Sequence, residues 1–86
     1  MIFITLGKFK HKPSKNSEQT REALVSAVKK EGGKILGSYW TLGAYDFVTI
    51  VEAPETKAIE NAMKGLLRLS DNVTTETLVA LKRETQ

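Results

Sequence analysis

A single α+β domain is the fold class that this sequence predicts, with elements in the order β-α-β-β-α-β. The first of three observations is that segments rich in β-branched and aromatic residues alternate with segments of helical periodicity. The second is that glycine and proline stand between them, where turns and helix ends require them. The third is the length of 86 residues, which suits one domain over residues 1–86. Such an order forms a four-stranded antiparallel sheet with both helices on one face, the ferredoxin-like arrangement.

The first half of the chain predicts a strand, a loop and a helix. Ile2 to Lys10 favours a strand, and His11 to Asn16, which contains a proline and a serine, favours a loop. From Ser17 onward apolar residues recur at helical spacing, while charged residues take the other faces. Gly32-Gly33 ends this helix, because glycine readily adopts the left-handed conformation found at helix ends.

The second half predicts a β-hairpin, a helix and a last strand. Lys34 to Thr41 and Tyr45 to Ala53 favour strands, and residues 42–44 join them through a glycine that tolerates positive φ. Pro54 fits the first turn of the second helix, where its missing N–H is harmless. Val73 to Lys82 predicts the fourth strand. The second helix has the clearest amphipathic stripe in the chain, formed by Ile59, Ala62, Met63, Leu66 and Leu67.

Both faces of the predicted sheet carry large apolar side chains. Successive residues of a strand point to opposite faces of the sheet. Phe3 and Ile4 therefore point to different faces, and so do Phe47 and Val48. The helices cover one face, and an uncovered apolar face usually marks an interface. We expect the aromatic-rich face to be the uncovered one and to join copies of the chain into a homodimer or higher oligomer. The expected interface residues are Phe3, Phe9, Tyr45, Phe47 and Val51.

The composition argues against several function classes. The chain has no cysteine and one histidine, which leaves no recognisable cluster of metal ligands. The sequence also has no phosphate-cradling glycine loop and no nucleophile elbow. No cofactor is expected. A net charge of +3 does not demand a nucleic-acid partner. Since no apolar run approaches the ~20 residues of a membrane span and no signal-peptide pattern opens the chain, we expect no membrane partner and a cytoplasmic location.

One edge of the predicted domain is a candidate ligand site. In this topology the end of the first strand, the hairpin and the start of the last strand share that edge, so aromatic, basic and acidic groups converge there. The candidate ligand-binding residues are Lys8, His11, Trp40, Tyr45, Asp46 and Thr75.

Each prominent member of this set also has a structural interpretation. Asp46 is placed to accept a hydrogen bond from the hairpin backbone, as aspartate often does in turns. Tyr45 and Trp40 are suited to anchoring an interface, and His11 is suited to a surface position in a lysine-rich loop. The catalytic residues, if the protein is an enzyme, are not identified by any motif.

The hairpin region resembles the GYD family of small proteins. The resemblance rests on Gly43-x-Tyr45-Asp46 at the start of an apolar strand and on Glu52-Ala53-Pro54 before the second helix. Gly32-Gly33-Lys34 and Thr75-Glu76-Thr77-Leu78 extend it over most of the chain. It implies a ferredoxin-like fold of the dimeric α/β-barrel type. It implies no particular activity.

Three functions fit these observations. The leading prediction is a homo-oligomeric small-molecule-binding or regulatory domain. An alternative is a small cofactor-free enzyme of the dimeric-barrel kind, with His11 or Asp46 as its acid or base. The other alternative is an RNA-binding module, because Ile2 to Leu6 and Tyr45-x-Phe47-Val48 resemble motifs of the RNA-recognition fold, although Asp46 would repel phosphate.

Overall fold

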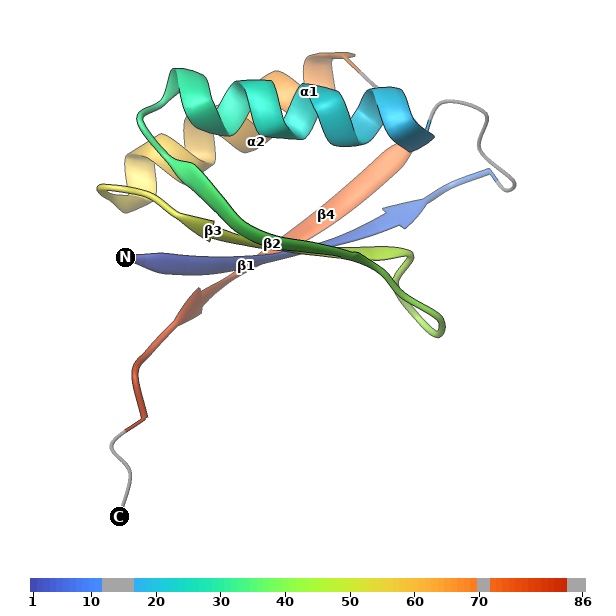
Figure 1. Cartoon of the computed structure of the whole chain (residues 1–86). Coiled ribbons are helices and arrows are strands. Elements are labelled where there is room, and N and C mark those ends of the chain that lie inside the picture. Colours follow the sequence, from blue (N-terminus) through green and yellow to red (C-terminus); the bar gives the residue numbers. More distant parts are fainter. Residues whose placement is uncertain (12–16, 70–71, 84–86) are drawn as a thin grey trace.

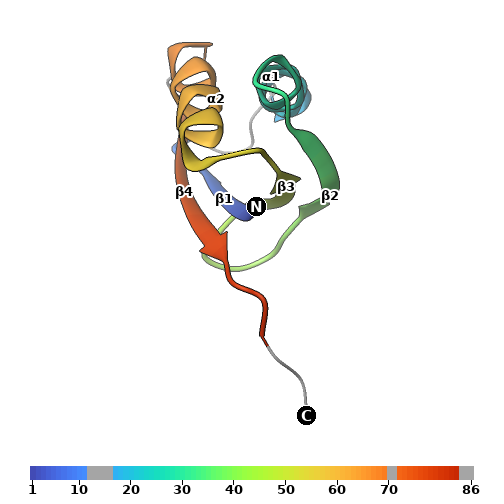
Figure 2. The same cartoon turned by 90° about the vertical axis from the view of Figure 1, so that its left-hand side faces the viewer.

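The computed structural model describes residues 1–11, 17–69 and 72–83, and it confirms the predicted element order. Its elements form one antiparallel sheet of strand order β2-β3-β1-β4, with both helices on the same face (Figures 1 and 2). The fold is therefore ferredoxin-like, as predicted. The elements are β1 (Ile2–Phe9), α1 (Ser17–Lys30), β2 (Lys34–Trp40), β3 (Phe47–Glu52), α2 (Thr56–Leu69) and β4 (Val73–Ala80).

The hairpin between β2 and β3 is longer than predicted, because β3 begins at Phe47 rather than at Tyr45. Thr41 closes it by donating its backbone N–H to the carbonyl of Asp46 at 2.9 Å and its hydroxyl to the carbonyl of Tyr45 at 2.7 Å. Gly43 has a φ of 123°, as its predicted role in the turn requires. The predicted loop at His11 to Asn16 lies largely outside the described residues.

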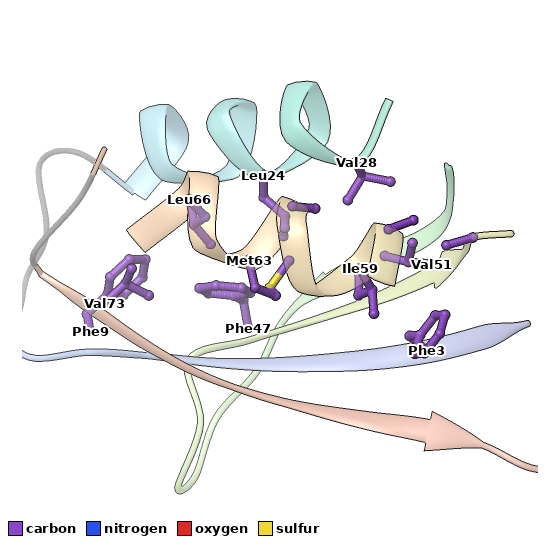
Figure 3. Close-up of a cluster of buried hydrophobic side chains, with 13 residues drawn as sticks. Phe3, Phe9, Leu24, Val28, Phe47, Val51, Ile59, Met63, Leu66 and Val73 are labelled. Carbon is purple, nitrogen blue, oxygen red and sulfur yellow. The ribbon is translucent and has the colours of Figure 1, made fainter. Parts of the chain in front are cut away.

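The hydrophobic core lies between the helices and the sheet (Figure 3). The predicted stripe of α2 is buried with one exception: Leu67 keeps 47% of its surface exposed. α1 contributes Leu24 and Val28, which are almost fully buried. Figure 2 shows α1 above the β2 side of the sheet and α2 above the β4 side. The sheet contributes Phe3, Phe9, Phe47, Val51 and Val73.

The expected interface was therefore assigned to the wrong face for Phe3, Phe9, Phe47 and Val51. These side chains are 0–7% exposed in the single chain and contact the helices rather than solvent. The physical reason is volume: the space between a sheet and two helices needs large groups, and here aromatic rings fill it. The backbone accommodates them, since Phe47 lies over Gly7 so closely that a β-carbon there would overlap the ring.

The uncovered face of the sheet is also apolar, as predicted, but its centre is aliphatic rather than aromatic. The register places Ile4 beside Ile50 and Leu6 beside Val48 at its centre. Tyr39 of β2 and Leu78 of β4 continue the same face to the two edges. We call this the open face. Its large apolar side chains are Ile2, Ile4, Leu6, Tyr39, Val48, Ile50 and Leu78.

None of the helices within residues 17–69 is long and apolar enough to cross a membrane.

Candidate functional site

Asp46 extends the pairing of β3 with β1 beyond the end of the regular ladder. Its backbone N–H donates to the carbonyl of Gly7 at 2.7 Å, and its carboxylate Oδ2 accepts the backbone N–H of Phe9 at 2.7 Å. A charged acceptor makes this a stronger bond than a neutral one. The carboxylate thus bonds backbone, as its structural interpretation predicted, but the backbone belongs to β1 and not to the hairpin. Asp46 fixes where the hairpin leaves the sheet.

Tyr45 bridges the hairpin to the edge strand β4. Its hydroxyl donates to Oε1 of Glu76 at 3.0 Å. Glu76 lies on the open face, opposite Leu6 in the register, so the tyrosine side chain reaches over the end of β1. The hydrogen bond to the Glu76 carboxylate, together with its negative charge, raises the pKa of Tyr45. The sequence alone does not indicate this contact, since 31 residues separate the pair along the chain.

Trp40 lies on the helix side at the opposite edge of the sheet. Its ring meets Phe47 edge-on, with centroids 6.3 Å apart and an interplanar angle of 88°. Beside it, between α1 and β2, is a cavity of about 30 Å³ that is lined in part by Arg21 and Ser38. A space of this size holds water but not a metabolite. The exposed half of Trp40 is therefore available for contact with another molecule rather than for enclosing one.

The remaining predicted ligand residues lie apart from this tryptophan. His11 is exposed, and its backbone is held by Asn72, whose side-chain Oδ1 accepts the His11 N–H at 2.8 Å. Lys8 is exposed on the open-face side of β1, while Thr75 lies on the helix side of β4, opposite Gly7. The predicted ligand-binding residues thus lie on both faces and at both edges of the sheet. The fold does not bring them together in one cleft.

A row of hydroxyl groups crosses the helix side of the sheet, and sequence reasoning missed it. The register aligns Ser38, Thr49, Thr5 and Thr77, one from each strand. The hydroxyls of Thr5 and Thr77 are 3.3 Å apart, and those of Ser38 and Thr49 are 3.5 Å apart. Thr5 and Thr49 are fully buried, and no buried side-chain polar atom among the described residues lacks a partner. The signal was a threonine in step with the buried residues of each central strand: Thr5 follows Phe3, and Thr49 stands between Phe47 and Val51.

The largest hollow near these residues is a groove between α2 and β4, which we call the α2–β4 groove. Its volume is about 340 Å³. Thr75 and Thr77 line it from the strand, and Glu60 and Lys64 stand at its rim on the helix. Its apolar lining consists of Phe3, Ile59, Met63, Leu67 and Val79.

Acidic and histidine side chains do not gather anywhere in residues 1–11, 17–69 and 72–83: no group of three or more could hold a metal ion. Two exposed ion pairs stand on α2, where Glu60 lies 3.0 Å from Lys64 and 3.8 Å from Lys57. These lysines lower the pKa of Glu60, mainly through the hydrogen bond from Lys64.

Solved structures with the same fold come from several kinds of protein. FFRP-DM1 matches with a TM-score of 0.67 and 18% identity, over 93% of this chain and 97% of that one. TTHA0845 from Thermus thermophilus matches with a TM-score of 0.63 and 19% identity, over 99% and 98%. The leucine response regulatory protein LrpA of Mycobacterium tuberculosis matches with a TM-score of 0.65 and 13% identity, over 99% of this chain and 53% of LrpA.

Sequence comparison identifies a relative and a family. The relative, from Thermus thermophilus, is named glutamine synthetase and cystathionine beta-lyase binding protein. It is 34% identical over 67 residues, which are 78% of this chain and 70% of the relative. The model of the GYD domain family matches residues 3–86. Since this match spans nearly the whole chain, as the Gly43-x-Tyr45-Asp46 resemblance predicted, the chain belongs to the GYD domain family.

Proposed function

We propose that this GYD domain is a homo-oligomeric regulatory domain that pairs with copies of itself through the open face and binds partner proteins. The observation that carries the proposal is the uncovered apolar face. Ile2, Ile4 and Leu6 of β1 keep part of their surface exposed in the single chain, as do Val48 and Ile50 of β3. Such a face gains about 25 cal/mol for each Å² of apolar surface that a partner removes from water.

A second copy is the occupant that the charges of the open face favour. Lys8 stands at one end of β1, and Glu52 of β3 stands beside the other end, opposite Ile2. If two open faces pack with their strands reversed, Lys8 of each copy approaches Glu52 of the other. The aliphatic centres then face each other between two pairs of opposite charge. This self-complementarity is what a two-fold interface requires.

Partner proteins are proposed from the named relative. That protein is described as binding two enzymes, glutamine synthetase and cystathionine beta-lyase. At 34% identity this chain resembles it closely enough to make the same two enzymes the first partners to test. The exposed half of Trp40 and the fully exposed Leu42 provide apolar surface outside the open face.

The two alternative functions receive less support from the geometry. Base stacking requires aromatic rings on the uncovered face of a sheet, whereas Phe3 and Phe47 are buried beneath the helices. Acid–base catalysis by Asp46 competes with the hydrogen bond that its carboxylate accepts from Phe9. Small-molecule binding stays a prediction, and a thermal-shift screen tests it, because a ligand of the native state raises the unfolding temperature.

Two measurements test the proposed function. Light scattering of the purified protein is expected to give a particle of at least twice the 9.5 kDa of one chain. Biolayer interferometry with the immobilised protein is expected to detect binding of purified glutamine synthetase or cystathionine β-lyase from the organism that encodes this chain. Serum albumin is the negative control. A particle of 9.5 kDa at high protein concentration would contradict self-association. If neither enzyme gives a binding signal, the assignment of these partners is contradicted.

A further inference from the structure

The two edges of the sheet differ in how they are protected from pairing with another strand. At the β2 edge the register shifts between Ile35 and Gly37, so that Leu36 forms a bulge. At the β4 edge the register runs without interruption from Val73 to Ala80. Bulges, lysines and prolines are the usual devices that blunt an edge. β4 has no bulge, lysine or proline in its sequence Val-Thr-Thr-Glu-Thr-Leu-Val-Ala. Its one charged residue, Glu76, lies on the open face, away from the helix side.

The backbone groups on the outer side of β4 can be identified from the register. The N–H of Lys10 donates to the carbonyl of Asn72, so this opposite pair is hydrogen-bonded. Hydrogen-bonded and non-hydrogen-bonded pairs alternate along an antiparallel ladder. The even-numbered residues of β4 therefore bond to β1, and the odd-numbered ones direct their N–H and C=O groups outward. Within the described ranges no segment pairs with that side of β4.

The same odd-numbered residues line the α2–β4 groove. Thr75, Thr77 and Val79 put their side chains on the helix side, where Leu67 and Met63 of α2 form the opposite wall. Val79 and Leu67 are each 47% exposed. Phe3, which pairs with Val79 in the register, and Ile59 of α2 also line the groove, and Figure 3 shows these two side chains near each other in the core. The unpaired backbone row and the apolar groove thus lie side by side along one strand.

We propose that the β4 edge and the α2–β4 groove together bind an extended segment of a partner protein, which adds a strand to the sheet. The inference rests on the proposed function, that the chain binds proteins, and names the surface and the kind of partner. Backbone hydrogen bonds to Thr75, Thr77 and Val79 hold the segment. Side chains at alternate positions of the segment enter the groove and select its sequence.

The geometry fixes the chemistry of the segment. Alternate residues of a strand are about 6.8 Å apart, so three of them lie opposite Thr75, Thr77 and Val79. The groove they meet is apolar, which favours valine, leucine or isoleucine at those positions. The rim charges are already paired within α2, as Glu60 lies 3.0 Å from Lys64. A segment without charge at its groove-facing positions is therefore the complementary partner.

A synthetic peptide tests the proposal directly with the full chain. The probe is the capped, fluorescent nonapeptide Lys-Thr-Val-Thr-Val-Thr-Val-Thr-Lys, whose valines alternate. Its control carries N-methyl groups on the valines, which removes the N–H donors that would face β4 and keeps the side chains. Fluorescence anisotropy is expected to detect binding of the first peptide and at least tenfold weaker binding of the second. Equal binding of both peptides would overturn the proposal.

Variants of β4 locate the site. Thr75→Pro removes an outward N–H and leaves the bonds to β1 intact, whereas Thr75→Val keeps that N–H. The proline variant is expected to bind the probe about fivefold or more weakly, as the loss of one backbone hydrogen bond implies. Val79→Asp and Leu81→Asp place the same charge two residues apart, in the groove and beyond the end of β4 respectively, where Leu81 is exposed. The first is expected to lose the probe and the second to keep it.

Enzyme binding separates this inference from the proposed function. If wild type binds either enzyme but Val79→Asp binds as tightly as Leu81→Asp, with both folded by circular dichroism, the groove is not the binding surface and the proposal is wrong. If the wild-type protein binds neither enzyme, the assignment of these two enzymes as partners is wrong. The peptide experiment still decides whether the β4 edge accepts an added strand. Unchanged probe binding in both Thr75→Pro and Val79→Asp overturns the inference.

Discussion

The two faces of the sheet are both apolar, yet they differ in residue type and in burial. The helix side carries phenylalanines and a row of hydroxyls, and all of its central residues are buried within one chain. The open face carries aliphatic side chains that stay partly exposed. Aromatic rings fill the gap between the helices and the sheet, whereas aliphatic side chains of two sheets can interdigitate when the sheets pack face to face. The difference separates residues that make the fold from residues that are free to make an assembly.

Phe3→Ala is expected to give the largest effect, because Phe3 is fully buried on the helix side. The loss of unfolding free energy should be about 3–5 kcal/mol, as for other buried phenylalanines. Chemical denaturation monitored by circular dichroism measures it. Ile4→Asp is the matched change on the open face, and it should keep the fold while lowering the mass seen by light scattering. An Ile4→Asp variant that stays oligomeric would contradict the assignment of self-association to the open face.

Gly7→Ala tests how tightly the helix side is packed. A β-carbon at Gly7 would overlap the ring of Phe47, so we expect a loss of about 1–3 kcal/mol of unfolding free energy. Shortening the neighbour in Gly7→Ala/Phe47→Leu should recover part of that loss, which a double-mutant cycle measures. Equal stability of Gly7→Ala and wild type would mean that the ring moves aside at little cost.

Asp46→Ala is expected to cost about 1–3 kcal/mol, because the N–H of Phe9 loses its acceptor. Asp46→Asn retains an oxygen that can accept the same bond, and it should recover most of the stability. Thermal unfolding of the two variants makes the comparison. Binding of a small molecule that is lost in Asp46→Asn, with the fold intact, would instead favour the predicted ligand-binding role.

The smallest expected effect concerns the bridge across the open face. The Tyr45 hydroxyl donates to Glu76, and the pKa of Tyr45 is raised. A pKa raised by folding contributes stability that is present below the unfolded value of about 10 and is lost as pH rises through the folded value. In a Tyr39→Phe background, ultraviolet titration should give a lower pKa for Tyr45 after Glu76→Gln. An unchanged titration would mean that the bridge does not form in solution.

Much of the fold could be predicted from sequence because the signals are local. The stripe of α2, the glycines after α1 and in the hairpin, and the alternating strands all depend on residues a few positions apart. The family could be predicted for the same reason, from the motif around Tyr45 and Asp46. The candidate site was harder, because Tyr45 and Glu76 are 31 residues apart and meet only through the register of β4 on β1.

What the sequence determined by itself was the order of the elements, the family and the presence of two apolar faces. What only the tertiary structure decided was which face the helices cover, which edge is left unblunted and where the groove lies. The physical reason is that a period of two tells which residues share a face but treats the two faces alike. Packing breaks that symmetry, because Phe47 fits over Gly7 on one side of the sheet and the helices close on that side.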